Sequence, residues 1–275
     1  MTSTAEPTKQ IVQGNKLRGR VAFVTGGTRG IGAAISRSLA TQGATVAAGY
    51  ARNTSQADQF LADLNATGRN DVNYSVHKGD VASAEDCRRT IDEVIAEHGR
   101  IDILINNAGI TIDRTVLKME DDDWDKVISV NLSGAFYLAQ AALRHMLERG
   151  TGRIVNVSSV IGETGNIGQA NYAASKAGLF GLTKTLAKEA TFTWQGRPAH
   201  PRQHRRHCQH CHPGFVATEM VESIPEKVLG RITDSIPVKR LADPQEIARV
   251  VHFLAADASS YITGQVWGVN GGLDM

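Results

Sequence analysis

The sequence predicts an α/β protein, in which one doubly wound parallel sheet of about seven strands carries helices on both faces. From Arg20 onward, short apolar segments alternate with helix-like segments, which is typical of strand–helix–strand units. The segments VAFV, DILI and RIVNV are nearly continuous apolar runs, as strands buried on both sides are. Because no linker, repeat or low-complexity tract divides the chain, a single domain is expected over residues 18–275.

The individual elements follow from local patterns. Apolar residues between Ile31 and Leu39 recur at helical spacing, so a helix is expected directly after the first strand. Ser83 precedes acidic residues and is expected to cap the third helix. Strands are expected at about 20–25, 44–50, 73–81, 101–109, 152–159 and 265–272, and further helices at about 55–67, 83–99, 121–149, 171–192 and 243–256.

The composition is that of an ordinary globular protein. Hydrophobic residues make up 41% of the 275 residues, charged residues make up 21%, and the net charge is +2. This balance argues against a protein that binds nucleic acid or a membrane surface. Three cysteines (Cys87, Cys208 and Cys211) make no disulfide framework, which favours a cytoplasmic location. Residues 1–17 are polar, lack a signal-peptide pattern and are expected to be a flexible segment.

A glycine-rich turn, Thr25-Gly26-Gly27-Thr28-Arg29-Gly30-Ile31-Gly32, lies between the first strand and the first helix. Glycines there allow a tight turn and a close approach to a pyrophosphate, whose charge the helix N-terminus stabilises. Such a turn alone is also compatible with a plain strand–helix connection. Its position before an amphipathic helix favours nucleotide binding and a Rossmann-type fold.

The spacing TGxxxGxG, together with NNAG at Asn106–Gly109 and YxxxK at Tyr172–Lys176, resembles the short-chain dehydrogenase/reductase family. The resemblance runs from about Arg20 to the C-terminus, apart from one stretch described below. It implies a single-domain Rossmann-type oxidoreductase that uses a nicotinamide cofactor.

The end of the second strand indicates which nicotinamide cofactor to expect. A carboxylate there would hold the ribose of NAD, but the strand ends Gly49-Tyr50-Ala51-Arg52-Asn53. Arg29 and Arg52 are available for a 2′-phosphate, although either could be a solvated surface charge, so NADP(H) is expected. Within the family pattern, Asp80 and Val81 match adenine-contacting positions, and Thr218 matches a position that contacts the carboxamide. The full implied set of cofactor-binding residues is Gly26, Thr28, Arg29, Gly30, Ile31, Gly32, Tyr50, Arg52, Asp80, Val81, Asn107, Ala108, Gly109, Tyr172, Lys176, Pro213, Gly214, Val216 and Thr218.

Tyr172 and Lys176 lie four positions apart and would share one face of a helix. A carbonyl reductase must deliver a proton to oxygen as hydride reaches carbon. A tyrosine with a pKa near 10 is a poor acid or base at neutral pH unless a cation stabilises its phenolate, and Lys176 would supply that cation. YxxxK occurs by chance in many helices, but here it follows a strand that carries Ser158 and Ser159.

The family resemblance selects the remaining catalytic residues. Its serine stands thirteen residues before the tyrosine, which selects Ser159 over Ser158, and its asparagine stands forty-one before, which is Asn131. The implied roles are general acid for Tyr172 and a hydrogen bond to the substrate carbonyl for Ser159. Lys176 would lower the tyrosine pKa and hold the nicotinamide ribose, and Asn131 would hold a proton-relay water.

The stretch from Trp194 to His212, WQGRPAHPRQHRRHCQHCH, does not fit this fold. The topology requires a buried parallel strand just before Pro213, and the string is too polar to be expected to form one. A metal site is one alternative, but HRRHCQHCH lacks the separated ligand pairs of usual zinc modules, so no metal is expected. A genuine insertion is another alternative.

The favoured interpretation of residues 194–212 is a local reading-frame error. Histidine, glutamine, arginine and cysteine codons read one base later give β-branched and small residues. With plausible codons PRQHRRHCQHCH becomes PDNIGVTVNTVT, which supplies a strand that runs directly into PGFVATEM.

The segment after Gly214, the segment GETGNIGQANYAASKAG and the terminal NGGLDM resemble bacterial acetoacetyl-CoA reductases of polyhydroxyalkanoate biosynthesis. The 3-oxoacyl-(acyl-carrier-protein) reductases of fatty acid biosynthesis follow closely. Both imply NADPH-dependent reduction of a 3-oxoacyl thioester to the (3R)-hydroxyacyl thioester. The choice between CoA and acyl-carrier protein stays open, since Lys118, Lys227, Lys239 and Arg240 could meet either or be plain surface charges. The resemblance also implies a homotetramer, with the 121–149 and 171–192 helices at one interface.

Two further alternatives remain. One is another secondary-alcohol or steroid dehydrogenase of the same family. The other is not an enzyme but an inactive nucleotide-binding product damaged at 194–212. The retained set of Asn131, Ser159, Tyr172 and Lys176 argues against that last reading, and the damaged strand argues for it.

Overall fold

Seven strands form one sheet in the computed structural model, which describes residues 14–66, 69, 71–192, 205–222 and 224–275. The strands are β1 (Val21–Val24), β2 (Thr45–Tyr50), β3 (Tyr74–Lys78), β4 (Ile103–Asn106), β5 (Thr151–Val157), β6 (Arg205–Pro213) and β7 (Val266–Val269). Their order across the sheet is β3-β2-β1-β4-β5-β6-β7, and each neighbouring pair is parallel. The doubly wound parallel sheet predicted from the sequence is confirmed.

Helices fill the connections between these strands. They are α1 (Gly30–Thr41), α2 (Thr54–Asn65), α3 (Ala84–His98), α4 (Asp121–Ile128), α5 (Gly134–Arg149), α6 (Ile161–Thr164), α7 (Ala170–Phe192), α8 (Glu219–Glu222), α9 (Glu226–Ser235) and α10 (Pro244–Ala255), with 3-10 turns η1 (Val116–Lys118) and η3 (Asp257–Ser259). Ser83 caps α3 as expected, because its hydroxyl accepts a hydrogen bond from the backbone N–H of Asp86 at 3.2 Å.

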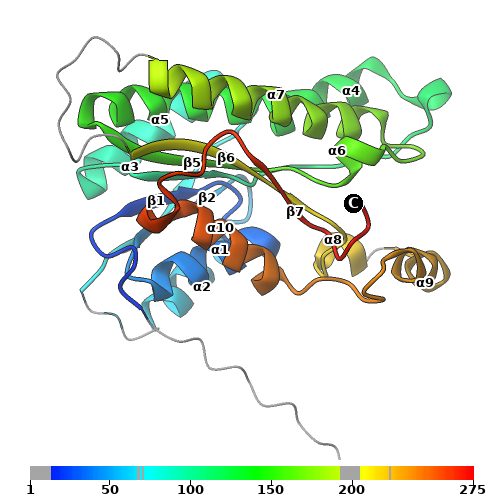
Figure 1. The fold of residues 1–275 in the computed structure, drawn as a ribbon, viewed down its shortest axis with the longest axis horizontal. Helices are drawn as coiled ribbons and strands as arrows, with labels where there is room; N and C mark the ends of the chain where they lie inside the picture. Colours follow the sequence, from blue (N-terminus) through cyan, green and yellow to red (C-terminus); the bar gives the residue numbers. More distant parts are fainter. Residues whose placement is uncertain (1–13, 67–68, 70, 193–204, 223) are drawn as a thin grey trace, which may run out of the picture.

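The sheet is the middle layer of three (Figure 1). Helices α1, α2 and α10 cover one face, and α3, α5 and α7 cover the other. Alternate residues of β1 show why both faces are apolar: Ala22 and Val24 enter the first core, whereas Val21 and Phe23 enter the second. Burying a side chain such as Phe23 stabilises the fold by roughly 1.5–3 kcal/mol.

The long helix expected at 121–149 is present but is not a uniform α-helix. Between α4 and α5 the chain makes a π-helical turn, η2 (Ser129–Ser133). A π turn adds one residue to the helical path, and such turns occur frequently at functional sites. Here it contains Asn131, whose side chain is buried.

The domain was expected to begin at residue 18, but the residues just before it already pack against the domain. Residues 1–13 lie outside the described residues. Gly14 donates a backbone hydrogen bond to the carbonyl of Thr41, and Leu17 donates one to Gln42. Leu17 is also 1% exposed within the core that includes α1. Its apolar side chain explains why this part of the segment is ordered.

The expectation that the residues before Pro213 cannot form a strand is wrong. The structure places β6 between β5 and β7 and pairs it in parallel with both. The ladder uses backbone N–H and C=O groups, which a polar side chain leaves intact. Residues 194–204 of the suspected stretch lie outside the described residues.

The polar side chains of β6 are nevertheless buried at a cost. His210 and Gln209 are 0% exposed, and neither ring nitrogen of His210 has a hydrogen-bond partner among the described residues. Burial lowers the pKa of His210 from 6.5 to about 3, assisted by repulsion from His212 and nearby lysines. Its ring lies edge-on to Phe180, with centroids 4.5 Å apart. Each unpartnered buried polar atom costs roughly 1–3 kcal/mol.

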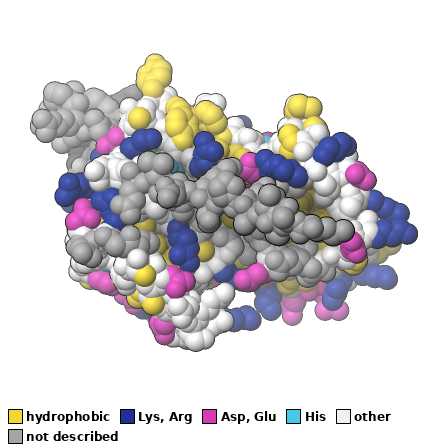
Figure 2. Space-filling model, turned by 90° about the horizontal axis from the view of Figure 1, so that it is seen from below, with side chains coloured by type: hydrophobic (Ala, Val, Ile, Leu, Met, Phe, Trp, Pro, Cys, Tyr) yellow, Lys and Arg dark blue, Asp and Glu magenta, His cyan; other side chains and the backbone are white. Residues whose placement is uncertain are grey.

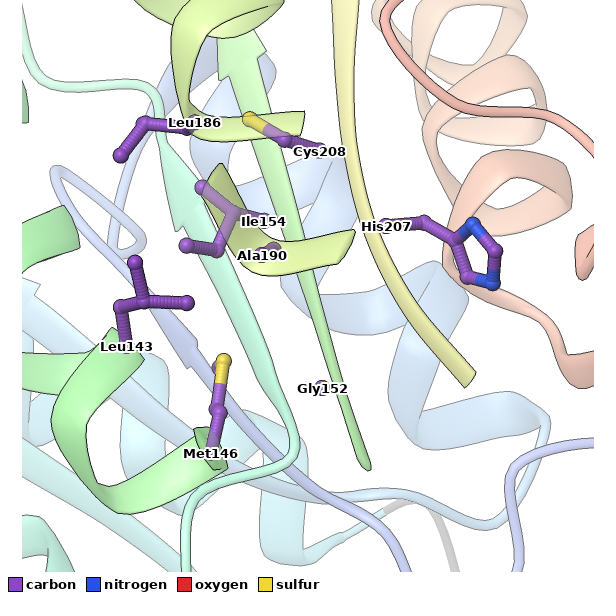
Figure 3. Close-up of a pocket in the computed structure, with 8 residues that line it drawn as sticks. All are labelled: Leu143, Met146, Gly152, Ile154, Leu186, Ala190, His207 and Cys208. Atoms are coloured by element: carbon purple, nitrogen blue, oxygen red, sulfur yellow. The ribbon is translucent and has the colours of Figure 1, made fainter. Parts of the chain in front are cut away.

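A small apolar cavity lies beside the first half of β6 (Figure 3). It is lined by Leu143, Met146, Gly152, Ile154, Leu186, Ala190, His207 and Cys208. The ring of His207 points away from this cavity toward the opposite face of the sheet, whereas Cys208 faces α7. The short cysteine side chain therefore leaves space on the α7 face of the strand.

The surface on the α1 and α2 side mixes basic and acidic side chains without separating them by sign (Figure 2). Among the described helices, none has both the length and the apolar character needed to cross a membrane.

Candidate active site

The carboxyl ends of the parallel strands meet at one edge of the sheet. The connections from β1 and β4 run to opposite sides there, which is where open α/β sheets bind their ligands. The glycine-rich turn follows β1, the NNAG motif follows β4, and Ser158 and Ser159 follow β5. Three motifs that are distant in the sequence are therefore neighbours in the fold.

Glycine is required at several positions of the turn. Gly26 and Gly30 have φ values of +59° and +51°, a region that other residues rarely adopt. A Cβ atom on Gly32 would lie 2.7 Å from Nδ2 of Asn107. The turn thus brings backbone to the N-terminus of α1 without side chains in the way, which fits a bound pyrophosphate.

Thr25 and Asn107 fix the turn against the end of β4. The backbone N–H groups of Asn107 and Ala108 donate to Oγ1 of Thr25 at 3.0 and 2.9 Å. Nδ2 of Asn107 donates to the carbonyl of Thr25 at 2.9 Å. Sequence analysis did not single out Thr25 as a site residue, although the threonine lies in the quoted motif.

The residues expected to bind the ribose phosphate and the adenine lie around the same edge. Arg52 and Asp80 are exposed, following β2 and β3, and Tyr50 lies within 3.5 Å of the Thr54 hydroxyl. Asp80 accepts a hydrogen bond from the backbone of Ala82 at 2.9 Å.

Arg29 has an ion-pair partner at this edge, and its role in cofactor binding stays a prediction. Its Nη1 lies 3.1 Å from a carboxylate oxygen of Glu219 in α8, and both side chains are about 60% exposed. A side chain expected to meet a phosphate is therefore paired with a carboxylate from a segment 190 positions further along.

The two β6-linked residues Pro213 and Gly214 extend the same edge. The carbonyl of Pro213 accepts a hydrogen bond from the N–H of Val160 at 2.9 Å, and Gly214 donates to Val269 at 3.1 Å. Further on, Val216 pairs with Ala242 in an isolated bridge.

Thr218 lies against the glycine-rich turn, because its methyl group would be 3.7 Å from a Cβ on Gly30. Its hydroxyl donates to the carbonyl of Val216 at 3.4 Å. The segment after β6 is thus in contact with the turn after β1.

Tyr172 and Lys176 occupy the first two turns of α7, on the face toward β5. The hydroxyl of Ser159 hydrogen-bonds to that of Tyr172. Lys176 is 4% exposed, its Nζ donates to the carbonyl of Val157 at 3.0 Å, and it lies 5.6 Å from the Tyr172 ring centroid. The structure thus brings together the serine, tyrosine and lysine that the sequence selected.

Burial controls the protonation of this group. It raises the pKa of Tyr172 above 10, an effect to which Asp113 adds and which the bond to Ser159 partly offsets. Burial also lowers the pKa of Lys176 from 10.5 to about 8. Lys176 is not among the groups that shift the Tyr172 pKa in this structure, where its ammonium donates to the Val157 carbonyl, so its role in lowering that pKa stays a prediction.

Asn131 holds the connection after β4 in place. Its Oδ1 accepts from the backbone N–H of Ile110 at 2.8 Å, and its Nδ2 donates to the carbonyl of Ile110 at 3.0 Å. Nδ2 also lies 3.1 Å from Oγ of Ser175, whose hydroxyl donates to the carbonyl of Tyr172 at 2.7 Å. Ser175, which sequence analysis did not select, therefore links Asn131 to the tyrosine.

Gly109 lies between these groups. A Cβ there would be 3.3 Å from Oδ1 of Asn131 and 3.4 Å from Nζ of Lys176. Its missing side chain leaves a cradle bordered by a buried cation, which fits the ribose end of a nicotinamide nucleotide.

A glycine-rich turn at a helix N-terminus, on this sheet and beside such a tyrosine and lysine, is typical of an oxidoreductase that uses a nicotinamide cofactor. A family model described as enoyl-(acyl carrier protein) reductase matches residues 26–274. The chain belongs to the short-chain dehydrogenase/reductase family, whose members act on CH–OH and C=O groups.

Several curated relatives match almost the whole chain. An acetoacetyl-CoA reductase from Shinella zoogloeoides is 48% identical over 254 residues, which cover 92% of this chain and 98% of the relative. A (3R)-3-hydroxyacyl-CoA dehydrogenase from Homo sapiens is 43% identical over 267 residues, covering 95% and 98%. A 3-oxoacyl-(acyl-carrier-protein) reductase from Thermotoga maritima is 41% identical over 258 residues, covering 94% and 99%. The family predicted from the sequence is confirmed.

Proposed function

We propose that this protein reduces a 3-oxoacyl thioester to the (3R)-hydroxyacyl thioester with NADPH, and that acetoacetyl-CoA is its preferred substrate. The observation that carries the proposal is the Ser159–Tyr172 hydrogen bond beside the buried Lys176, at the same sheet edge as the glycine-rich turn. The thioester class comes from the relatives, since acetoacetyl-CoA reductases from three organisms are 41–48% identical.

The preference for NADPH rests on charge. The ribose-proximal end of β2 carries Arg52 and no carboxylate, and Arg29 stands at the N-terminus of α1. A guanidinium can bind a 2′-phosphate with two parallel hydrogen bonds. The remaining cofactor contacts are proposed for the residues identified from the sequence around Gly26–Gly32, Asn107–Gly109 and Thr218.

When bound, the cofactor supplies a hydride to the substrate carbonyl carbon. Tyr172 is proposed to donate its phenolic proton to the carbonyl oxygen, and Ser159 to hold that oxygen by a hydrogen bond. The raised pKa of Tyr172 keeps the phenol protonated at neutral pH, as a general acid must be. Lys176, with a pKa of about 8, is a cation at pH 7 and would hold the nicotinamide ribose. Asn131 would keep the connection after β4 in place and hold a relay water.

The test follows NADPH absorbance with acetoacetyl-CoA for the full chain and for Tyr172→Phe. General acid catalysis contributes roughly 10²- to 10⁴-fold, so the variant is expected to lose that much kcat while keeping its affinity for NADPH. Tyr261→Phe is the matched control, because Tyr261 is fully exposed and its loss should leave the rate unchanged. Unchanged turnover by Tyr172→Phe would rule out the acid assignment.

The same assay separates the competing substrates. A higher kcat/KM with the acyl-carrier-protein thioester would favour a fatty acid biosynthesis reductase. Turnover of hydroxysteroids or simple secondary alcohols without any thioester activity would favour a secondary-alcohol or steroid dehydrogenase of the same family. NADPH binding without turnover of any carbonyl would leave the inactive-product hypothesis standing.

We also propose a cytoplasmic homotetramer with no nucleic-acid or membrane partner. Trp124 on α4 and Phe136 on α5 are 40% and 42% exposed, which supports an interface on these helices. Light scattering of the purified protein measures the assembly directly, and a monomer would refute it.

A further inference from the structure

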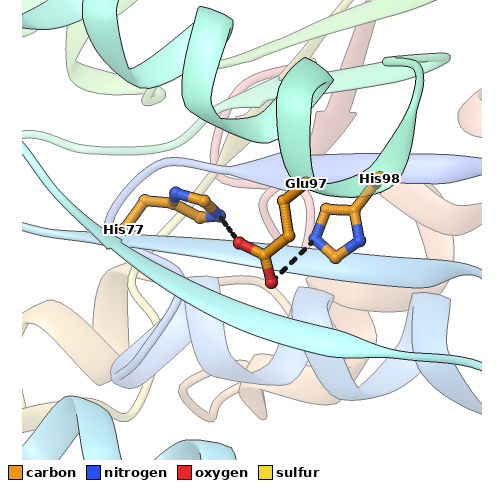
Figure 4. A group of neighbouring side chains, drawn as sticks. All are labelled: His77, Glu97 and His98. Carbon is orange, nitrogen blue, oxygen red and sulfur yellow. Dashed lines mark ion pairs between the residues drawn. The ribbon is translucent and has the colours of Figure 1, made fainter.

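Two buried histidines and one glutamate meet where β3 packs against the last turn of α3 (Figure 4). His77 comes from β3, and Glu97 and His98 come from α3. The histidine side chains are 6% and 4% exposed, whereas that of Glu97 is 52% exposed and gives access from solvent. One nitrogen or oxygen from each residue lies within 4.8 Å of the others.

The spacing of these atoms is close to that of metal ligands. Nε2 of His77 lies 3.6 Å from Oε2 of Glu97, and Nε2 of His98 lies 3.9 Å from Oε1. A tetrahedral zinc ion with bonds of roughly 2.0–2.2 Å holds its donors about 3.4 Å apart. Side-chain adjustments of about 1 Å would therefore complete the geometry.

Both imidazoles already point their Nε2 atoms at a common position. Oγ of Ser75 lies 2.8 Å from Nε2 of His77 and 2.7 Å from Nε2 of His98. A hydroxyl has one proton, so it donates to one ring and accepts from the other, and neither ring needs to be charged.

The surroundings favour a cation at this position. Oε2 of Glu93 lies 3.6 Å from Nδ1 of His77, where it can accept the ring proton that metal binding at Nε2 places there. The other oxygen of Glu93 is held by Arg89 at 2.6 Å. The C-terminus of α3, where His98 is the last residue, adds partial negative charge.

We propose that His77, Glu97 and His98 bind one zinc-like divalent transition-metal ion, with a water in the fourth position. The ion joins edge strand β3 to the end of α3. Sequence analysis considered metal binding only for the histidine- and cysteine-rich stretch at 194–212, because the spacing HKGD…EH across a strand and a helix carries no compact motif.

The test uses the full chain without an affinity tag, treated with a chelator and dialysed. Titration with Co²⁺ is expected to give the intense visible bands of a tetrahedral site at one ion per chain, and Zn²⁺ is expected to displace it and raise the Tm. His98→Gln is expected to weaken Zn²⁺ binding at least tenfold. His252→Gln, a histidine on α10 at the opposite face of the sheet, is the matched control and should bind normally.

Two more variants make the outcome decisive. Ser75→Ala removes the shared hydrogen bond, so a metal site keeps its affinity, whereas a serine-centred hydrogen-bond network loses only stability and never binds Co²⁺. Glu97→Gln replaces His98→Gln if the latter does not fold, because Glu97 is half exposed. No stoichiometric binding by the wild type, or unchanged binding by both ligand variants, overturns the proposal. The second result would place the ion elsewhere, such as on the histidine- and cysteine-rich stretch.

Discussion

Replacing His210 by threonine tests whether the buried polar side chains of β6 lower the stability of the protein. His210→Thr installs the residue that the shifted reading frame would give at this position. The histidine is 0% exposed and lies on a strand that is paired on both sides, so the change acts on the folded core.

The expected gain follows from the contacts of the ring. Two nitrogens without a hydrogen-bond partner cost about 2–6 kcal/mol together. The edge-on contact with Phe180, worth about 0.5–1.5 kcal/mol, is lost, and the smaller side chain leaves some empty volume. The net expectation is a free energy of unfolding about 1–4 kcal/mol higher, which is large against a typical total of about 5–15 kcal/mol.

His210 also predicts how stability depends on pH. Its pKa is about 3 in the folded state and 6.5 as a free side chain, so the unfolded chain binds more protons between these values. Above pH 6.5 both states are neutral and the group has no effect. As the pH falls from 7 to 5, the free energy of unfolding should drop by about 2 kcal/mol because of this residue alone.

Urea unfolding at pH 7.5 and pH 5.0, followed by circular dichroism at one protein concentration, measures both effects. His210→Thr should raise the midpoint at each pH and should lose less stability on acidification than the wild type. His252→Gln, which changes a half-buried histidine on α10, should raise the midpoint less and should change the pH dependence of stability less. Equal midpoints and equal pH dependence for wild type and His210→Thr would refute the reasoning.

Three further predictions concern the active site. Lys176→Met should abolish turnover yet raise the free energy of unfolding at pH 7 by about 2 kcal/mol, measured by urea unfolding. The pKa of Lys176 is about 8 in the folded protein and 10.5 in the unfolded chain, so the charged lysine lowers the free energy of unfolding; this loss is full below pH 8 and disappears toward pH 10.5. The variant also lacks the hydrogen bond to Val157, which offsets part of its gain in stability. Glu219→Gln should release Arg29 and tighten NADPH binding several-fold in a fluorescence titration, with NADH unaffected; equal effects on both would contradict this. Arg52→Ala should raise the KM for NADPH roughly tenfold and leave that for NADH unchanged, and a change in both would remove its assignment to the 2′-phosphate.

Most of the fold was predictable because most of its strands are apolar runs in the sequence, with glycine at their ends. Gly26 and Gly30, for example, mark the turn after β1 with positive φ values that the sequence pattern anticipates. The position of β6 was also inferred correctly from topology. That polar residues would form this strand was not predicted, because the backbone hydrogen bonds to β5 and β7 do not depend on the type of side chain.

The candidate site was predictable in position and less so in its charges. Spacing selected Ser159, Tyr172 and Lys176, which the structure brings together. The direction of the Tyr172 pKa depends on how deeply the ring is buried and where the Lys176 ammonium points, neither of which has a local sequence signal. The pairing of Arg29 with Glu219 depends on the path of the chain after β6 and was likewise out of reach.

The π turn at Ser129–Ser133 has a consequence for insertions and deletions in this part of the chain. Each residue of an α-helix advances the side chains by about 100° around the axis. An ordinary insertion of one residue into an α-helix would rotate α5 by that angle relative to α4, whereas the π turn takes up the extra residue within a single wider turn. The apolar stripe of Leu138, Ala142 and Met146 therefore keeps its direction toward the sheet, while Asn131 in the wide turn reaches the backbone of Ile110. A chain with one residue deleted there should keep the core packing of α5 and lose the contacts of Asn131, so stability should survive where activity does not.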